Sequence, residues 1–135
     1  MLIHFYEKPG CINNAKQQRL LELHGHRVEA HSILNQHWDE ATLRLFFNDM
    51  PVSEWFNRAA PRVKSGEIVP EAYDESEALK AMVNDPLLIR RPLIEVDGEM
   101  ACGFDNSLVK DLLGGNTYIS GLLSCPNVGT DSKCD

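Results

Sequence analysis

The sequence predicts an α/β fold in which a β-α-β unit comes first, an all-helical segment follows, and a β-β-α unit comes last. Three observations lead to this prediction. A short apolar and aromatic run at residues 2–6 is followed closely by helical periodicity. Asp97-Gly98, a strong hairpin-turn dipeptide, separates two short strand-like runs. Between these two regions, residues 35–84 carry mainly helical patterns.

The first unit is a strand, a turn, a helix and a second strand. Residues 2–6 have strand character, and Lys8-Pro9-Gly10 breaks the strand. Helical spacing follows over residues 11–24, with Gly25 as a natural C-cap. Arg27–His31 is the expected second strand. Because the helix is the crossover between the strands, we expect them to be parallel and right-handed.

The middle of the chain is expected to be helical. Asp39 is a plausible N-cap for a helix over Glu40–Asn48, and Ser53 for a shorter one. A third helix is expected over Glu71–Asn84, where apolar residues recur on one face. The whole segment, about residues 35–84, therefore separates the two strand-bearing parts of the chain.

The last unit is a hairpin followed by a helix. Leu93–Val96 and Glu99–Gly103 are the expected antiparallel strands on either side of the Asp97-Gly98 turn. Ser107–Leu113 is the expected helix, ended by two glycines. From residue 116 the periodicity is lost, and the end of the chain is polar and rich in turn residues.

A β-α-β unit and a β-hairpin that share one mixed sheet, with flanking helices, form the thioredoxin-like (glutaredoxin-like) arrangement. We therefore predict a single thioredoxin-like domain over residues 1–115, with the helical insertion at about 35–84. Residues 116–135 are predicted to be a mobile tail that contains two cysteines.

Composition excludes several classes of function. The chain has 135 residues, 43% hydrophobic residues and a net charge of −7, which suits one globular domain. An acidic protein is not expected to bind nucleic acid by itself, because a phosphate backbone requires a basic face. No run of residues is long and apolar enough for a membrane span, and the N-terminus lacks the pattern of a signal peptide. We therefore expect a cytoplasmic protein with reduced thiols.

Cys11 is the first candidate for chemistry. It lies between the turn after the first strand and the start of the first helix. Unpaired backbone N–H groups and the helix dipole stabilise an anion there, so a reactive thiolate is favoured. Lys8 and Lys16 could add positive charge nearby. The alternative is that Cys11 is a small apolar residue in a strand–helix turn.

The other cysteines have different contexts. Cys102 alternates with Met100 in a predicted strand, which indicates an inert core thiol. Cys125 and Cys134 lie in the polar tail. One of them could be a resolving thiol for Cys11, the two could pair with each other, or both could be without a role.

No metal site is predicted. The tail cysteines are eight residues apart, which does not match the short spacing of zinc ligands. A site could also be assembled from histidines, but nothing in the sequence brings them together. The histidines weighed for such a site are His24, His26, His31 and His37.

Two motifs carry a resemblance to a known family. One is Phe5–Cys11 (FYEKPGC), and the other is Pro86–Ile94 (PLLIRRPLI), about 80 residues further along. With these motifs in this order and a helical insert between them, the chain resembles the arsenate reductase (ArsC)/Spx family over roughly residues 1–113. Within that family it is most similar to the nitrogenase-associated branch.

The resemblance implies roles for particular residues. Cys11 takes the position of the nucleophile, which in arsenate reductases attacks the oxyanion and is then resolved by glutathione and glutaredoxin. Pro92 matches the cis-proline that faces this cysteine. No bound cofactor is implied, but glutathione is a candidate co-substrate, and glutaredoxin or another protein a candidate partner. The candidate residues for binding a small oxyanion are Arg91 and Arg58, which match family arginines, together with Lys8 and Asn14.

The sequence also departs from the family pattern. Gly103 stands where arsenate reductases have a third arginine, and Glu7 replaces a histidine before the cysteine. A glutamate there repels an anionic substrate. Asn14 stands where Spx-type regulators have a second cysteine, so a Cys-x-x-Cys switch cannot operate and a monothiol mechanism remains. Two functions stay open: a thiol-redox protein, and a non-catalytic Spx-like module that binds a protein partner or regulates it.

Overall fold

A computed structural model describes residues 1–114 of the chain. The predictions for Cys125, Cys134 and the mobile tail lie outside these residues. The strands are β1 (Leu2–Glu7), β2 (Arg27–Ser32), β3 (Leu93–Val96) and β4 (Glu99–Cys102). The α-helices are α1 (Ile12–Leu23), α2 (Glu40–Leu45), α3 (Pro61–Lys64), α4 (Glu75–Asn84) and α5 (Ser107–Leu112).

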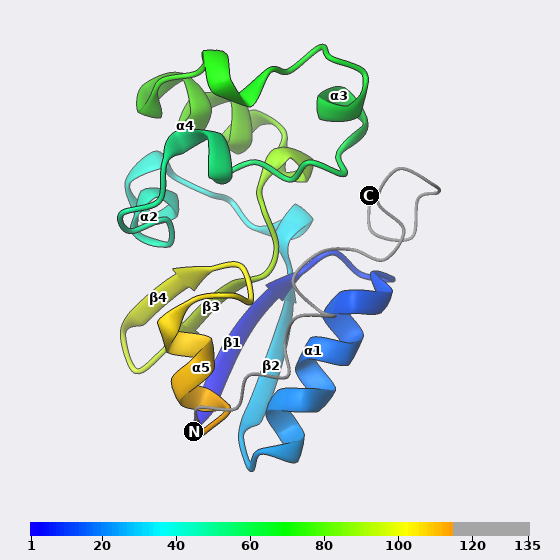
Figure 1. Cartoon of the computed structure of the whole chain (residues 1–135), viewed down its shortest axis with the longest axis vertical. Coiled ribbons are helices and arrows are strands. Elements are labelled where there is room, and N and C mark those ends of the chain that lie inside the picture. Colours follow the sequence, from blue (N-terminus) through cyan, green and yellow to red (C-terminus); the bar gives the residue numbers. More distant parts are fainter. Residues whose placement is uncertain (115–135) are drawn as a thin grey trace.

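The four strands form one mixed sheet in the order β2-β1-β3-β4 (Figure 1). β1 and β2 are parallel, with Leu2 opposite Arg27 at one end and Glu7 opposite Ser32 at the other. β3 runs antiparallel to both β1 and β4. The predicted β-α-β unit and hairpin therefore share a sheet, and the predicted fold class is confirmed.

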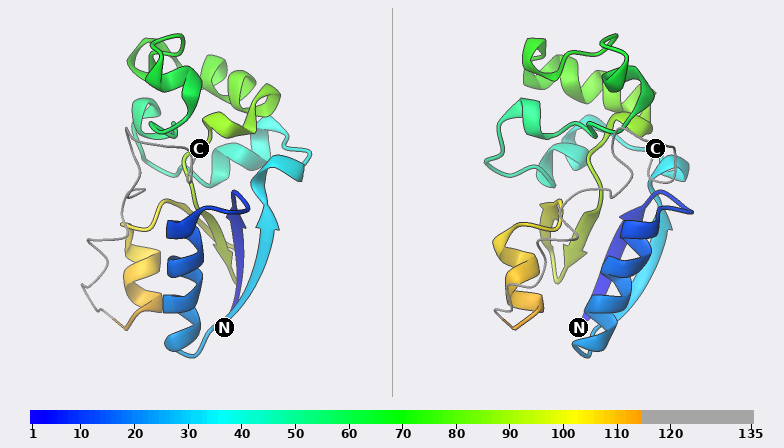
Figure 2. Two further views of the ribbon diagram at one scale, coloured as in Figure 1. Left: turned by 90° about the vertical axis from the view of Figure 1, so that its right-hand side faces the viewer. Right: turned by 45° about the vertical axis from the view of Figure 1, so that its right-hand side comes forward.

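Helices α1 and α5 cover one face of the sheet (Figure 2). Ile3 and Phe5 alternate along β1 and are fully buried toward these helices. Their neighbours His4 and Tyr6 point to the opposite face, because side chains alternate along a strand. The core on the helix side, here called the sheet core, contains Ile3, Phe5, Leu21, Ile94, Val96, Phe104, Val109, Leu112 and Leu113.

The segment between β2 and β3 forms a second packed unit beyond one end of the sheet (Figure 1). Its core is rich in aromatic side chains and continues onto the sheet through Leu93 and Cys102. Trp55 is fully buried there, stacks on Phe47 with a ring-centroid distance of 4.5 Å, and donates from Nε1 to the Met50 carbonyl at 2.9 Å.

Two helices of this segment differ in length from the sequence prediction. α2 ends at Leu45 rather than at Asn48, which has a left-handed backbone (φ 47°) and donates its side-chain amide to the Met100 carbonyl. α4 begins at Glu75 rather than at Glu71, because Asp74 forms a capping box with Glu77.

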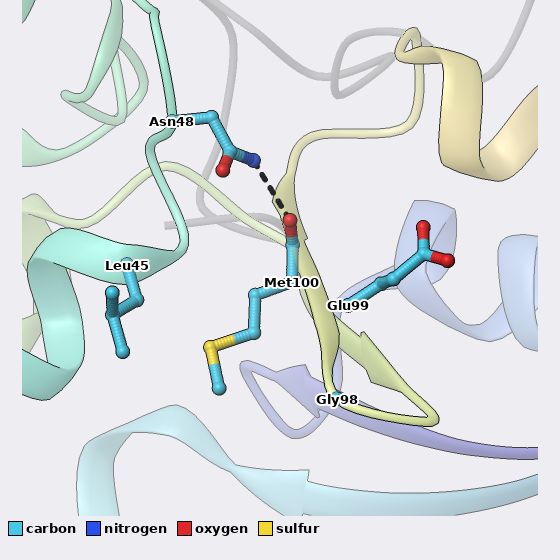
Figure 3. A pocket seen from close by; sticks show the side chains of 5 residues that line it. All are labelled: Leu45, Asn48, Gly98, Glu99 and Met100. Atoms are coloured by element: carbon cyan, nitrogen blue, oxygen red, sulfur yellow. Dashed lines mark hydrogen bonds between the residues drawn. The ribbon is translucent and has the colours of Figure 1, made fainter.

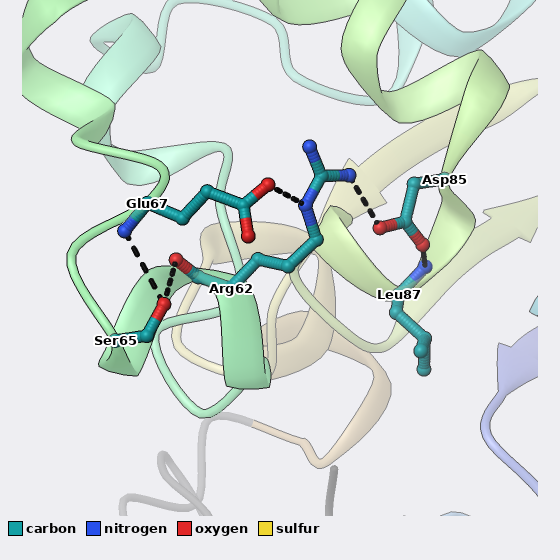
Figure 4. A network of polar contacts seen from close by, with 5 residues as sticks. All are labelled: Arg62, Ser65, Glu67, Asp85 and Leu87. Atoms are coloured by element: carbon teal, nitrogen blue, oxygen red, sulfur yellow. Dashed lines mark hydrogen bonds and ion pairs between the residues drawn. The ribbon is translucent and has the colours of Figure 1, made fainter.

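A polar network around Arg62 joins α3 to the end of α4 (Figure 4). The Arg62 guanidinium contacts Glu67 and Asp85, both at 2.8 Å. Asp85 also accepts a hydrogen bond from the Leu87 backbone N–H at 3.3 Å. The network therefore fixes the segment that leads from the helical insertion into the second sequence motif.

The hairpin turn forms as predicted, with positive φ at both Asp97 (51°) and Gly98 (84°). Beside it is an open hollow of about 300 Å³, lined by Leu45, Asn48, Gly98, Glu99 and Met100 (Figure 3). Among residues 1–114, none of the helices combines the length and apolar character that crossing a membrane demands.

Candidate functional site

Cys11 caps the start of α1. The turn that precedes it is closed by a hydrogen bond from the Cys11 N–H to the Lys8 carbonyl at 3.1 Å, and Gly10 supplies the positive φ (88°) that the turn requires. Cys11 has an extended N-cap conformation, and its side chain makes no capping hydrogen bond. The sulfur therefore lies at the positive end of a 12-residue helix, as the sequence predicts.

The Cys11 turn is held by amide side chains of α1. Asn14 Oδ1 accepts a hydrogen bond from the Lys8 backbone N–H at 3.3 Å, and Asn14 Nδ2 donates to Gln17 at 3.1 Å. Asn13, Asn14 and Gln17 are all buried. Asn14, a candidate anion ligand in the sequence analysis, thus positions the turn around Cys11.

Glu7 lies at the end of β1, directly before this turn. Its carboxylate accepts a hydrogen bond from Gln18 at 2.8 Å. Partial burial raises the pKa of Glu7 from its usual value, and the Gln18 hydrogen bond opposes that rise. The ionised carboxylate is therefore disfavoured in the folded protein relative to the unfolded chain.

Replacing Glu7 is expected to raise stability at neutral pH. A carboxyl group whose pKa is raised in the folded state stabilises the folded protein as the pH falls. At a pH where the group is ionised in both the folded and the unfolded state, it destabilises the folded protein. Glu7→Gln removes that destabilisation, so the melting temperature should rise modestly at pH 7. The difference should vanish below the ordinary pKa of 4.5, where both states are protonated. Thermal melts of Glu7→Gln and of the exposed α1 control Glu22→Gln test this, and an equal rise for both variants would contradict it.

Arg91 and Pro92 lie at the end of the sheet where β1 leads into the Cys11 turn. Tyr6 of β1 pairs with Leu93 of β3, so continuing the antiparallel register places Pro92 beside Glu7. The Arg91–Pro92 peptide bond is cis, as the resemblance implies. β3 therefore begins where β1 leads into the Cys11 turn. The Nε and Nη1 nitrogens of the half-buried Arg91 are shielded from solvent.

Arg58 is held in an ion pair. Its guanidinium contacts the Glu71 carboxylate at 2.6 Å and the Ser53 carbonyl at 3.2 Å, and about half of the side chain is exposed. Arg58 would have to leave Glu71 in order to bind an anion. Of the two candidate arginines, Arg91 is thus the one that the strand register brings toward the Cys11 turn.

The backbone conformation and the neighbours of Gly103 both disfavour a side chain at this position. Gly103 has φ 86°, and a Cβ atom there would lie 3.1 Å from both Arg90 Nη2 and Asp105 Oδ1. Arg90 and Asp105 form an ion pair at 3.1 Å in that place. A third arginine at this position would therefore displace an existing ion pair.

Cys102 is chemically distinct from the expected reactive cysteine. It is buried, and burial raises the pKa of its thiol to about 12. Its Sγ donates to the Arg90 carbonyl at 3.5 Å. These facts agree with the prediction of an inert core thiol at position 102. Cys11 is buried as well, so burial alone does not separate the two cysteines.

The hollow beside the hairpin is separate from the Cys11 turn. Its five lining residues come from α2, the residues that follow α2, and the β3–β4 hairpin. None of them belongs to the predicted site. The hollow is therefore no part of the predicted site.

A polar cluster that the sequence analysis missed lies across β1 and β2. It consists of His4, Glu29 and His31, whose candidate ligand atoms all lie within 4.8 Å of one another. Sequence spacing does not reveal it, because two strands supply the residues. The predicted parallel pairing, taken with the register, could have placed them on one face.

A family model and a relative each match most of the chain. The ArsC family model matches residues 6–112. An uncharacterized 15.7 kDa protein of Rhodospirillum rubrum, from the 3' region of draG, is 53% identical over 131 residues. That match covers 96% of this chain and 92% of the relative.

Solved structures share the fold at low sequence identity. An ArsC family related protein from Bacteroides fragilis superposes with a TM-score of 0.71 at 19% identity, covering 83% of this chain and 98% of that one. An arsenate reductase from Vibrio cholerae gives a TM-score of 0.68 at 20% identity, covering 84% and 98%. At these identities the structural likeness concerns the fold.

Proposed function

The chain belongs to the ArsC family, and from this premise we propose that it is a thiol-redox protein with Cys11 as its nucleophile. The observation that carries the proposal is the placement of Cys11 at the N-terminus of α1, at the end of the sheet where Arg91 and Pro92 lead into β3. In this proposal Arg91 binds a small oxyanion beside the sulfur, because guanidinium groups match oxyanions in charge and geometry.

The proposed chemistry uses one protein thiol and glutathione as co-substrate. The Cys11 thiolate attacks the central atom of the oxyanion, and hydroxide leaves as the S–As bond forms when arsenate is the substrate. A glutathione thiolate then attacks the Cys11 sulfur. The S–As electron pair stays on arsenic, which leaves as arsenite, and Cys11 is left in a mixed disulfide. A glutaredoxin thiolate attacks the glutathione sulfur and releases the Cys11 thiolate.

Arsenate-dependent turnover with glutathione and glutaredoxin tests this proposal. Arg91→Ala is expected to lower kcat/KM by about 10²–10³-fold, the usual effect of removing one donor to a developing anion. Arg19→Ala, which removes an exposed arginine of α1, is the matched control and should retain activity. Equal activity of the two variants would exclude Arg91 as the anion ligand, and a wild-type protein without arsenate turnover would exclude arsenate as the substrate.

A second candidate function is a protein-binding or regulatory module. Two observations favour it: Glu7 places a carboxylate beside the Cys11 turn, and the Arg90–Asp105 ion pair stands where a third arginine would project. An association with nitrogenase is proposed together with the thiol-redox function. It is supported by the resemblance and by the relative from the draG region.

Binding measurements with purified nitrogenase components separate the two candidates. We expect the thiol-redox protein to lose its partner complex in Cys11→Ala, because that complex is a mixed disulfide. Retained binding by Cys11→Ala, with a Kd like that of the wild type, would favour the module.

A further inference from the structure

His4, Glu29 and His31 lie on the face of the sheet opposite α1 and α5. Along β1, His4 lies between Ile3 and Phe5, which are buried against those helices, so its side chain is on the other face. In the parallel register His4 pairs with Glu29, and His31 is two residues further along β2. The three side chains therefore share one face, away from the Cys11 turn.

Distances between the polar atoms are short. His4 Nδ1 lies 3.1 Å from His31 Nε2, and His31 Nε2 lies 3.9 Å from Glu29 Oε1. Ligand nitrogens around a tetrahedral zinc ion are about 3.3 Å apart, given Zn–N bonds of about 2.0–2.1 Å. The spacing of the two histidine nitrogens is thus close to that of two ligands of one ion. A bound ion would take the place of the hydrogen atom in the hydrogen bond between them.

The cluster is accessible and partly fixed in place. The His31 side chain is 28% exposed and that of Glu29 is 54% exposed, so an ion can reach them from solution. The His31 ring stacks on Tyr6 with a centroid distance of 5.0 Å, which restricts its orientation. Glu95 of β3 pairs with His4 on the other side of β1, so a further carboxylate side chain lies on the same face of the sheet.

We propose that His4, Glu29 and His31 form a site for a divalent transition-metal ion of the zinc type. Two imidazoles and a carboxylate match the ligand preference of zinc and of neighbouring ions such as Co²⁺, and water completes the coordination. This site is independent of the proposed chemistry at Cys11, since it lies on β1 and β2 and uses no cysteine.

The other histidines weighed from the sequence do not join this site. His24 Nδ1 contacts the Leu20 carbonyl at 3.0 Å, and His26 Nε2 contacts the Leu112 carbonyl at 2.6 Å. His37 is exposed in the segment before α2. His31 is the member of that set that contributes, with partners on adjacent strands.

Calorimetric titration of the full-length protein with Zn²⁺ tests the proposal. We expect His4→Ala and His31→Ala each to weaken binding at least about tenfold, since loss of even an outer-sphere partner costs about 10–100-fold. Glu29→Gln, which keeps the size of an exposed side chain, should also weaken it. His37→Ala is the control and should bind like the wild type.

Cobalt spectra distinguish this site from binding at the cysteines. The wild-type protein with Co²⁺ should give visible bands of nitrogen and oxygen coordination, and these should be lost in Glu29→Gln as well as in the histidine variants. Unchanged zinc affinity in all three ligand variants would overturn the proposal. So would a cobalt spectrum dominated by thiolate charge transfer, or no zinc binding by the wild type at millimolar concentration.

Discussion

Cys11→Ser is expected to abolish arsenate-dependent turnover, whereas Cys102→Ala should retain it. Both cysteines are buried, but they lie at different places in the fold. Cys11 is at the N-terminus of α1, where the helix dipole favours an anion. Burial raises the pKa of the Cys102 thiol to about 12, so its thiolate is scarce at pH 7. Since the thiolate is the nucleophile, Cys102 cannot substitute for Cys11.

Mass spectrometry provides the second measurement of this prediction. After incubation with oxidised glutathione, peptide mapping should find the adduct on the Cys11 peptide and not on the Cys102 peptide. The mapping also separates Cys125 and Cys134, so glutathione on the tail is not mistaken for glutathione at the site. Preferential modification of Cys102, or full turnover by Cys11→Ser, would contradict the assignment of the nucleophile.

Trp55→Ala is expected to lower the free energy of unfolding by about 3–5 kcal/mol, as for other large-to-small aromatic substitutions in cores. Trp55 is fully buried and stacks on Phe47 with an interplanar angle of 6°. The substitution also removes the Nε1 donor from the Met50 carbonyl. A loss this large is a substantial fraction of the stability of a small domain.

Urea denaturation of Trp55→Ala and of Leu45→Ala measures this effect. Leu45 is 56% exposed, so its truncation should change the stability by no more than about 0.5 kcal/mol. Similar losses in the two variants would show that the helical segment does not depend on the Trp55 core.

The difference between the predicted and observed end of α2 has a tertiary cause. Helical periodicity continues through Phe46 and Phe47, but α2 ends at Leu45 and a left-handed Asn48 follows, bonded to the Met100 carbonyl of β4. That hydrogen bond joins residues 52 positions apart. Local sequence patterns cannot reveal this hydrogen bond, because it depends on how the insertion packs on the hairpin.

Local features determined the parts of the fold that the sequence predicted well. The Asp97-Gly98 turn, the alternation along β1 and the Cys11 turn before α1 each depend on residues that are neighbours in the chain. Turn residues with positive φ and side-chain periodicity are properties of short segments, so they can be recognised without the fold.

The amino-acid sequence was therefore sufficient to predict the order of the four strands, the position of Cys11 at a helix start, and the motif that contains Arg91 and Pro92. It did not predict the short helix α3. Tertiary structure alone decided that Arg58 is paired with Glu71, that an ion pair stands beside Gly103, and that His4, Glu29 and His31 converge. The physical reason is that these contacts join side chains distant in sequence or on different strands. Strand register and the packing of the insertion, rather than local propensity, set their distances.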